Sequence, residues 1–218
     1  EIEINEFLLL NDFQLKKIFP KIKKNIKFSN HKLKMNLEKK ILMVNGMGNI
    51  LLQNNNDKLT YSINKKGKIL NFKTSLRVKD NPLIIDFLNY KKEENNEILI
   101  NLNGSKELKN KTKIDLISLK ENNNKFIIEG LELDKEFKIT DLKTANISYR
   151  DRENVKNKFN IINKKDNFYV AGSIFNANKL VESLINDDED ELDIINKNFK
   201  LIIKIDKLFL DPENSLSN

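Results

Sequence analysis

The chain has 218 residues, of which 39% are hydrophobic, and its formal net charge is +7 with a pI near 9.2. It has no cysteine, which excludes disulfides, thiolate metal sites and cysteine nucleophiles. No apolar run approaches the roughly 18 residues of a membrane-spanning helix, and no signal peptide is visible. The chain opens on a strand pattern at Glu1 instead of Met, so we expect a segment of a longer protein.

Residues 1–30 predict a short strand followed by a basic helical stretch. Ile2 and Ile4 begin the strand. Over residues 12–28, apolar side chains recur on one helical face, with lysines on the rest of the surface. Pro20 interrupts this pattern, so we predict one helix ending before it and a turn or a second short helix after it. Such a helix can bind a membrane surface, but we expect it to cover one end of a sheet.

Residues 31–165 predict a β-meander. Apolar residues alternate with lysine and asparagine, and turns rich in Asn, Asp, Gly and Lys separate the runs. Short turns of this kind favour antiparallel pairing between strands that follow each other in sequence. Residues 82–90 are apolar, but the run is too short to be assigned to a strand or a helix.

Residues 166–218 predict a strand, a short helix, an acidic loop and a second strand. Residues 168–174 alternate with a period of two, and the period changes to helical spacing over residues 177–185. Asn176 or Asn178 can cap the helix, and the face formed by Leu180, Val181 and Leu184 predicts docking onto the sheet. The acidic run 187–191 ends the helix, and residues 199–205 alternate again.

This last unit carries a resemblance to a known family. The run Val170-Ala-Gly-Ser-Ile-Phe-Asn-Ala-Asn-Lys-Leu-Val-Glu-Ser-Leu-Ile, followed by Phe199-Lys-Leu-Ile-Ile-Lys-Ile-Asp-Lys-Leu-Phe-Leu, resembles the AsmA-like family of bacterial envelope proteins. The departures are Ile174 and Asn176, where Phe and Asp are more usual nearby. The resemblance implies a strongly twisted antiparallel sheet curled into a hydrophobic groove. It also implies a periplasmic location in a Gram-negative bacterium, an inner-membrane anchor outside this chain, and phospholipid transfer between inner and outer membrane.

The polar residues predict neither catalysis nor a metal or cofactor site. His31 is the single histidine and lies in a lysine-rich turn, which predicts a surface residue without a role in a site. Gly46 and Gly48 form a G-x-G with strand patterns on both sides, which is typical of a bulge or a close approach instead of a phosphate loop. The run 187–191 lacks the glycine and the spaced final glutamate of a calcium loop.

The feature that remains is the apolar face that the strands share. Two short helices cannot cover about a dozen strands spaced roughly 4.8 Å apart, so the sheet either packs on itself or leaves a groove. Pattern alone favours a sandwich, and the family resemblance favours the groove. We expect a single mainly β segment, residues 1–218, that binds phospholipid and no nucleic acid. The residues predicted to line the groove are Ile98, Ile100, Leu102, Ile114, Leu116, Phe159, Ile161, Phe168, Val170, Phe199, Leu201, Ile203 and Ile205.

Two other functions stay open at this point. In the first, the chain is a non-catalytic structural or adhesive envelope protein, and its apolar face is simply its core. In the second and weaker one, it is a basic module that binds an anionic polymer. A filled interior would favour the first, and salt-sensitive binding to nucleic acid would favour the second.

Overall fold

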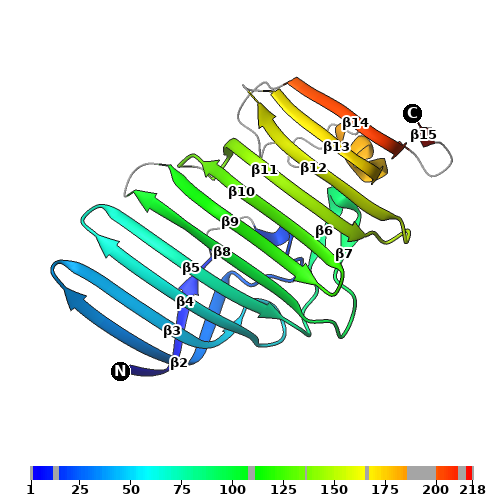
Figure 1. The fold of residues 1–218 in the computed structure, drawn as a ribbon. Helices are drawn as coiled ribbons and strands as arrows, with labels where there is room; N and C mark the ends of the chain where they lie inside the picture. The colour runs from blue at the N-terminus through cyan, green and yellow to red at the C-terminus, as the bar shows by residue number, and fades with distance from the viewer. Residues whose placement is uncertain are drawn as a thin grey trace.

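A computed structural model describes residues 2–11, 15–107, 111–135, 137–164, 167–185, 200–210 and 215–217. It is built on one thirteen-stranded sheet (Figure 1). The strands follow the order of the sequence, and β1 and β15 form the two edges of the described sheet. The strands are β1 Ile2–Leu10, β2 Asn25–Glu38, β3 Ile41–Leu51, β4 Asp57–Lys66, β5 Ile69–Val78, β8 Ile98–Glu107, β9 Thr112–Glu121, β10 Asn124–Leu133, β11 Ile139–Arg150, β12 Lys156–Lys164, β13 Asn167–Asn176, β14 Lys200–Phe209 and β15 Ser215–Ser217.

The prediction of a mainly β chain with a large antiparallel sheet and a short helix is confirmed. Every neighbouring pair in this sheet is antiparallel except β13 and β14, which run parallel. A parallel pair requires a crossover connection, and the helix α1, Asn178–Ile185, follows β13 directly. The predicted strand–helix–strand unit is therefore present. Phe199 and the acidic run 187–191 lie outside the described residues.

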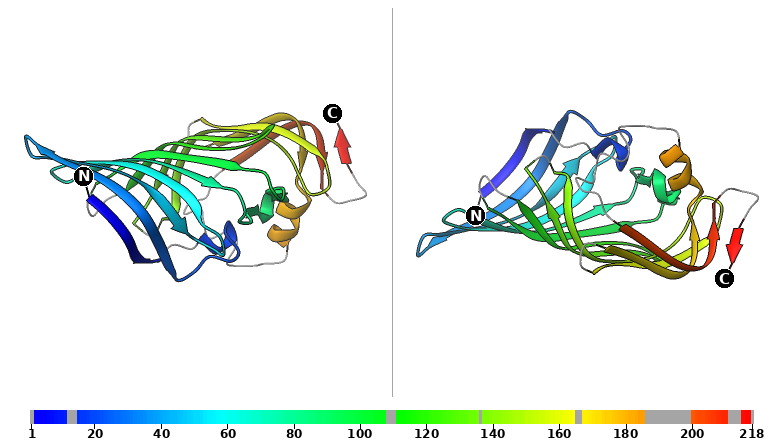
Figure 2. Two further views of the ribbon diagram at one scale, coloured as in Figure 1. Left: turned by 90° about the horizontal axis from the view of Figure 1, so that it is seen from below. Right: turned by 90° about the horizontal axis from the view of Figure 1, so that it is seen from above.

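Four short elements lie on one side of the sheet, near one end of its strands (Figure 2). They are η1 Leu15–Lys17, the hairpin strands β6 Ile84–Ile85 and β7 Tyr90–Lys91, and η2 Asp86–Leu88. The helix α1 lies beside them and contacts η2. One backbone hydrogen bond joins β6 to the residue after η1: the Ile84 N–H donates to the Ile18 carbonyl at 3.0 Å. Together η1, β6, η2 and β7 form a cover over one end of the sheet. Residues 82–90, which the sequence left unassigned, are part of this cover.

The prediction for residues 12–28 is correct in a short helix and a turn at Pro20, and wrong in the extent of the helical stretch. Within the described residues of this stretch, the only helical element is the three-residue η1, and β2 already begins at Asn25. Ile26 and Phe28 alternate along β2 and are both buried, so pairing with β1 and β3 overrides the helical spacing. Phe19 is buried in the core cluster, and Ile22 packs against it. The expectation that this stretch covers one end of the sheet is confirmed.

The buried core lies at the covered end of the strands. Most of its residues come from the start of β2, β4, β8, β10 and β12 and from the end of β3, β5, β9, β11 and β13, which are the same end in an antiparallel sheet. Ala145, Val170 and Ile205 extend the core toward the middle of β11, β13 and β14. Leu83, Leu88 and Tyr90 of the cover are buried against them. No helix among the described residues is long and apolar enough to span a membrane.

Candidate functional site

The strand register aligns mainly apolar residues into two rows on the covered face, with Gly172 in one row and Thr74 in the other. The inner row, nearer the cover, runs strand by strand through Leu59, Leu76, Ile100, Leu119, Phe126, Ile147, Phe159, Gly172 and Ile205. The outer row lies two residues further along each strand and runs through Tyr61, Thr74, Leu102, Ile117, Ile128, Ala145, Ile161, Val170 and Ile203. Directly paired residues share a face, so each row is one unbroken stripe.

The two rows differ in their cover. Most of the inner row is buried, and its residues belong to the same cluster as Leu83, Leu88 and Tyr90. Ala145 and Val170 of the outer row also belong to this cluster, but the other residues of that row are half-buried or, in the case of Ile203, 49% exposed. The apolar face is therefore packed at one end of the strands and accessible to solvent at the other. Such an apolar surface can hold the hydrocarbon part of a ligand without polar contacts.

The structure brings most of the predicted lining residues onto this face. Ile100, Phe159 and Ile205 lie in the inner row, and Ile98 is fully buried one step closer to the cover. Four more lie in the outer row: Leu102, Ile161, Val170 and Ile203. Phe168 and Leu201 pair with each other one step beyond the outer row. Ile114 is buried opposite Gly104 and Leu131.

Leu116 does not share this face. It pairs with Asn103 and Glu129, whereas its neighbour Ile117 pairs with Leu102 and Ile128. The cause is a β-bulge at the shift between Asn103 and Gly104, which breaks the alternation between Ile114 and Leu116. At Gly104 the backbone of β9 approaches so closely that a side chain would overlap the Lys113 carbonyl and Ile114 Cα.

Two central residues of the outer row, Ile117 and Ile128, were missed by sequence reasoning. Ile117 follows the apolar Leu116 and Ile128 follows the apolar Ile127, so the local pattern offered two phases and no way to choose. Gly104 was a signal for the bulge, because a glycine inside a strand pattern often marks one.

Buried polar groups attach the cover to the sheet. Glu121 at the end of β9 is fully buried, and one carboxylate oxygen accepts a hydrogen bond from the Tyr90 hydroxyl at 2.7 Å. The same oxygen accepts from Asn124 Nδ2 at 3.0 Å, and the other accepts from the Glu93 N–H at 2.9 Å. Burial and the nearby Glu121 carboxylate raise the pKa of Tyr90. Tyr90 therefore stays a hydroxyl donor, and the hairpin β6–β7 is held by a satisfied network.

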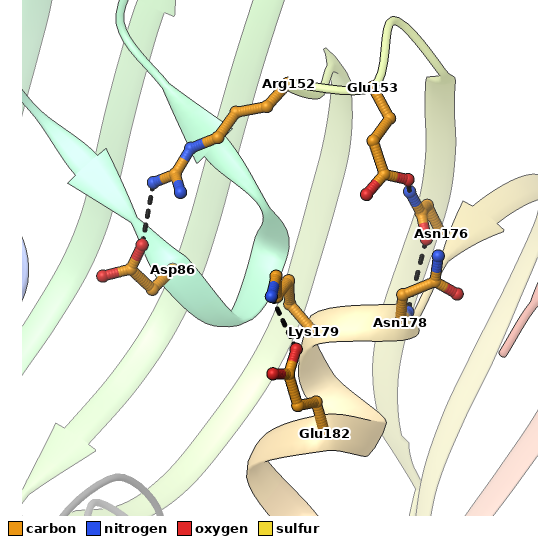
Figure 3. Close-up of polar contacts among 7 residues, drawn as sticks. All are labelled: Asp86, Arg152, Glu153, Asn176, Asn178, Lys179 and Glu182. Atoms are coloured by element: carbon orange, nitrogen blue, oxygen red, sulfur yellow. Dashed lines mark hydrogen bonds and ion pairs between the residues drawn. The ribbon is translucent and has the colours of Figure 1, made fainter. Parts of the chain in front are cut away.

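A second set of contacts links the cover to the turn between β11 and β12. The buried Tyr149 hydroxyl donates to the Leu88 carbonyl at 2.8 Å, and burial raises the pKa of Tyr149. Arg152 donates to the Asp86 carboxylate at 2.8 Å (Figure 3). This ion pair is partly exposed and adds little stability, so the buried Tyr149 contact is the stronger attachment.

Asparagines position the start of α1. Asn176 Nδ2 donates to Asp151 at 2.8 Å. It also donates to Glu153 at 2.8 Å, and Asn176 Oδ1 accepts from the N–H of Asn178, the first residue of the helix (Figure 3). The predicted capping role of Asn176 is thereby confirmed. Leu180 and Val181 pack against the core cluster, as predicted, while the side chain of Leu184 lies outside the described set.

His31 is a buried residue, not a surface one as predicted. It is 1% exposed and lies among the rings of Phe7, Phe28 and Tyr61, with centroids 5.4–6.0 Å away. Its Nε2 is 3.0 Å from the Asn49 carbonyl oxygen. The ring lies over Gly48, where a Cβ would overlap it. The predicted close approach at the G-x-G is confirmed. The sequence did not identify the group that approaches, the ring of His31, because it belongs to the neighbouring strand.

The opposite face of the sheet is more polar, and it is hollowed over β10–β13. This hollow is lined by polar and apolar residues together: Lys125, Asn146, Ile147, Ser148, Lys158, Phe159, Asn160, Ala171, Gly172 and Ser173. Among the described residues, no three His, Asp or Glu side chains gather as metal ligands. The apolar face is thus the feature with the clearest capacity to bind a ligand.

No family model, curated protein or solved structure matches this chain.

Proposed function

We propose that the chain is a non-enzymatic lipid-binding segment of an AsmA-like envelope protein, which carries phospholipid through the periplasm between the inner and outer membranes. The observation that supports this proposal is the outer row, which continues in register over nine strands and is buried only at Ala145 and Val170. Eight strand spacings of roughly 4.8 Å give it a length of about 38 Å.

The physical mechanism follows from this continuity. Each acyl CH₂ that leaves water for an apolar surface gains about 0.8 kcal/mol. Because neighbouring strands present similar apolar side chains, the contact energy changes little as the acyl chain moves by one strand. The headgroup remains in water at the exposed ends of the strands, so the transfer needs neither a cofactor nor a specific polar site.

The alternative is a structural or adhesive protein, and the inner row supports it. Its residues are already covered by Leu83, Leu88 and Tyr90, so part of the apolar face is a core. The two functions differ at the outer row. Lipid binding requires the outer row to bury itself against a ligand, whereas a structural protein leaves it as it is.

The absence of cysteine permits a direct test, because one introduced cysteine is the only thiol. Leu102 and Asn103 are adjacent on β8, both half-buried, and face opposite sides. With a polarity-sensitive dye on Leu102→Cys, short-chain phospholipid should shift the emission to the blue. The matched Asn103→Cys variant should show a much smaller shift. Equal shifts, or no saturable response at position 102, would contradict lipid binding on this face.

A charge in the outer row gives a second test. Ile203→Asp should reduce co-purified phospholipid with little change in thermal stability, because Ile203 is half-exposed and a new carboxylate stays hydrated. Ile202→Asp, on the same strand but paired with Tyr169 on the opposite face, is the control and should retain lipid. Unfolding of Ile203→Asp, together with a wild type that never binds lipid, would instead indicate a structural core.

A further inference from the structure

We infer that the tips of the β2–β3 and β4–β5 hairpins dock onto the surface of an anionic phospholipid bilayer. These hairpin tips, residues 35–42 and 65–70, lie at the far end of the molecule from α1 (Figure 2). They are adjacent, because Ile41 pairs with Lys66 and Leu42 with Lys65. The inference stands apart from the proposed function, since a protein can dock on a membrane without carrying lipid.

The first observation is charge. The hairpin tips contain five exposed lysines, Lys39, Lys40, Lys65, Lys66 and Lys68, and a single carboxylate, Glu38. Long basic side chains grouped at one projecting end complement the negative surface potential of anionic lipid. Per residue, this excess of positive charge is much larger than that of the whole chain, in which 39 basic residues face 32 acidic ones.

The second observation is exposed apolar surface among those lysines. Leu37 is 72% exposed, the highest value among the large hydrophobic residues of the described chain. Met35 and Ile69 are 50% and 49% exposed. Apolar side chains surrounded by lysines are typical of segments that insert into the headgroup region of a bilayer. A nucleic acid surface would favour aromatic side chains for stacking, and the hairpin tips contain none.

The third observation is the turn itself. Lys39 and Lys40 form a two-residue turn, and both have positive φ, 46° and 65°. This combination belongs to a type I′ turn, in which Asn-Gly is strongly preferred. A lysine pair there costs local stability, because a side chain with a Cβ is disfavoured at positive φ. The turn therefore carries two lysines at positions where local geometry favours Asn, Asp or Gly, which points to a role for the lysine side chains.

Vesicle flotation tests this directly. The wild type should float with vesicles of phosphatidylglycerol and phosphatidylcholine, more weakly at high salt, and not with phosphatidylcholine alone. Lys39→Asn/Lys40→Gly should weaken partitioning on the order of 30-fold, from about 1 kcal/mol for each lysine. The same variant should raise the melting temperature, because it introduces the preferred turn. Loss of binding with gain of stability cannot be explained by unfolding.

Lys16→Gln/Lys17→Gln is the matched control, since it removes two adjacent exposed lysines at the covered end. It should bind vesicles within a fewfold of the wild type. The inference is overturned if this control loses binding and the turn variant retains it, if the wild type never binds anionic vesicles, or if single-stranded DNA of equal charge binds as tightly as the vesicles.

Insertion can be followed with one reporter, because the chain has no tryptophan. Leu37→Trp should show a blue shift in fluorescence on adding anionic vesicles. Phe87→Trp, at a residue 45% exposed on the covered end, should not. These readouts are independent of the outer row, so Ile203→Asp should still float. Failure of flotation would leave the proposed lipid binding on the apolar face untouched.

Discussion

The hydrogen bond between Tyr90 and Glu121 should be one of the main attachments of the cover to the sheet. Glu121 is fully buried and accepts three hydrogen bonds, from Tyr90, Asn124 and Glu93. Tyr90→Phe removes one hydrogen bond to a charged acceptor, and such bonds contribute about 1.5–3 kcal/mol. We expect a loss in that range, with no large cavity because the ring remains.

Glu121→Gln should cost more. The amide of glutamine offers one oxygen, so its NH₂ group must face either the hydroxyl and amide donors of Tyr90 and Asn124 or the N–H of Glu93. We expect a loss of about 2–4 kcal/mol, because a buried donor then has no acceptor. Adding Tyr90→Phe to Glu121→Gln should cost less than it does in the wild type, since the hydrogen bond is already impaired.

Urea unfolding followed by circular dichroism gives the four free energies of this double-mutant cycle. Limited proteolysis near residues 84–91 reports whether the hairpin β6–β7 is released before the sheet unfolds. The predicted coupling energy is about 1–3 kcal/mol. A coupling below about 0.5 kcal/mol would refute the reasoning, because the two side chains would then act independently.

Three further predictions follow from the same structure. Gly172→Ala should lower the free energy of unfolding in urea by about 3 kcal/mol, because the new Cβ would overlap the Lys158 carbonyl and Phe159 Cα. In the control Gly67→Ala, the Cβ meets no atom within 4 Å but φ is +58°, so the loss should be only about 1–2 kcal/mol. Equal losses in the two variants would show that the close approach at β12 is not real. Burial raises the pKa of Asp57 from 3.8 to about 6, so the stability that its protonated form contributes is present below about pH 4 and is lost as the pH rises through 6. Asp57→Asn should therefore raise the melting temperature at pH 8 and lose that advantage at pH 4. A difference in melting temperature that does not change with pH would contradict the raised pKa. Leu180→Ala should destabilise by about 1–2 kcal/mol because this half-buried side chain packs α1 against the core, whereas a change below about 0.5 kcal/mol in thermal unfolding would mean that the helix is not docked.

The strand pattern could be read from the sequence because it is local. Alternation with a period of two, interrupted by turn residues, predicted the hairpins of β2–β5 and β8–β13 and the antiparallel pairing of neighbours. The change to helical spacing after residue 176 likewise predicted α1. Each of these features depends on residues within about ten positions of one another, so a single sequence contains the information.

The face that each side chain occupies needed the register across strands. A bulge moves every later residue of a strand to the other face, and the bulge near Gly104 therefore separated Leu116 from Ile114. The bulge and the approach of β9 to Gly104 that accompanies it arise from the pairing between β8 and β9, which the period along one strand does not report. Alternation alone places Leu116 with Ile114 and gives no reason to prefer Ile117.

The cover was decided only by tertiary structure. The helical spacing over residues 12–28 lost to strand pairing at Ile26 and Phe28, because β2 buries them between two neighbouring strands. Leu88 of the apolar run 82–90 and the lone His31 became buried through partners tens of residues away, such as Tyr149 for Leu88 and Tyr61 for His31. The sequence by itself determined that an apolar face exists, and the long-range packing decided which half of that face is core and which half remains accessible.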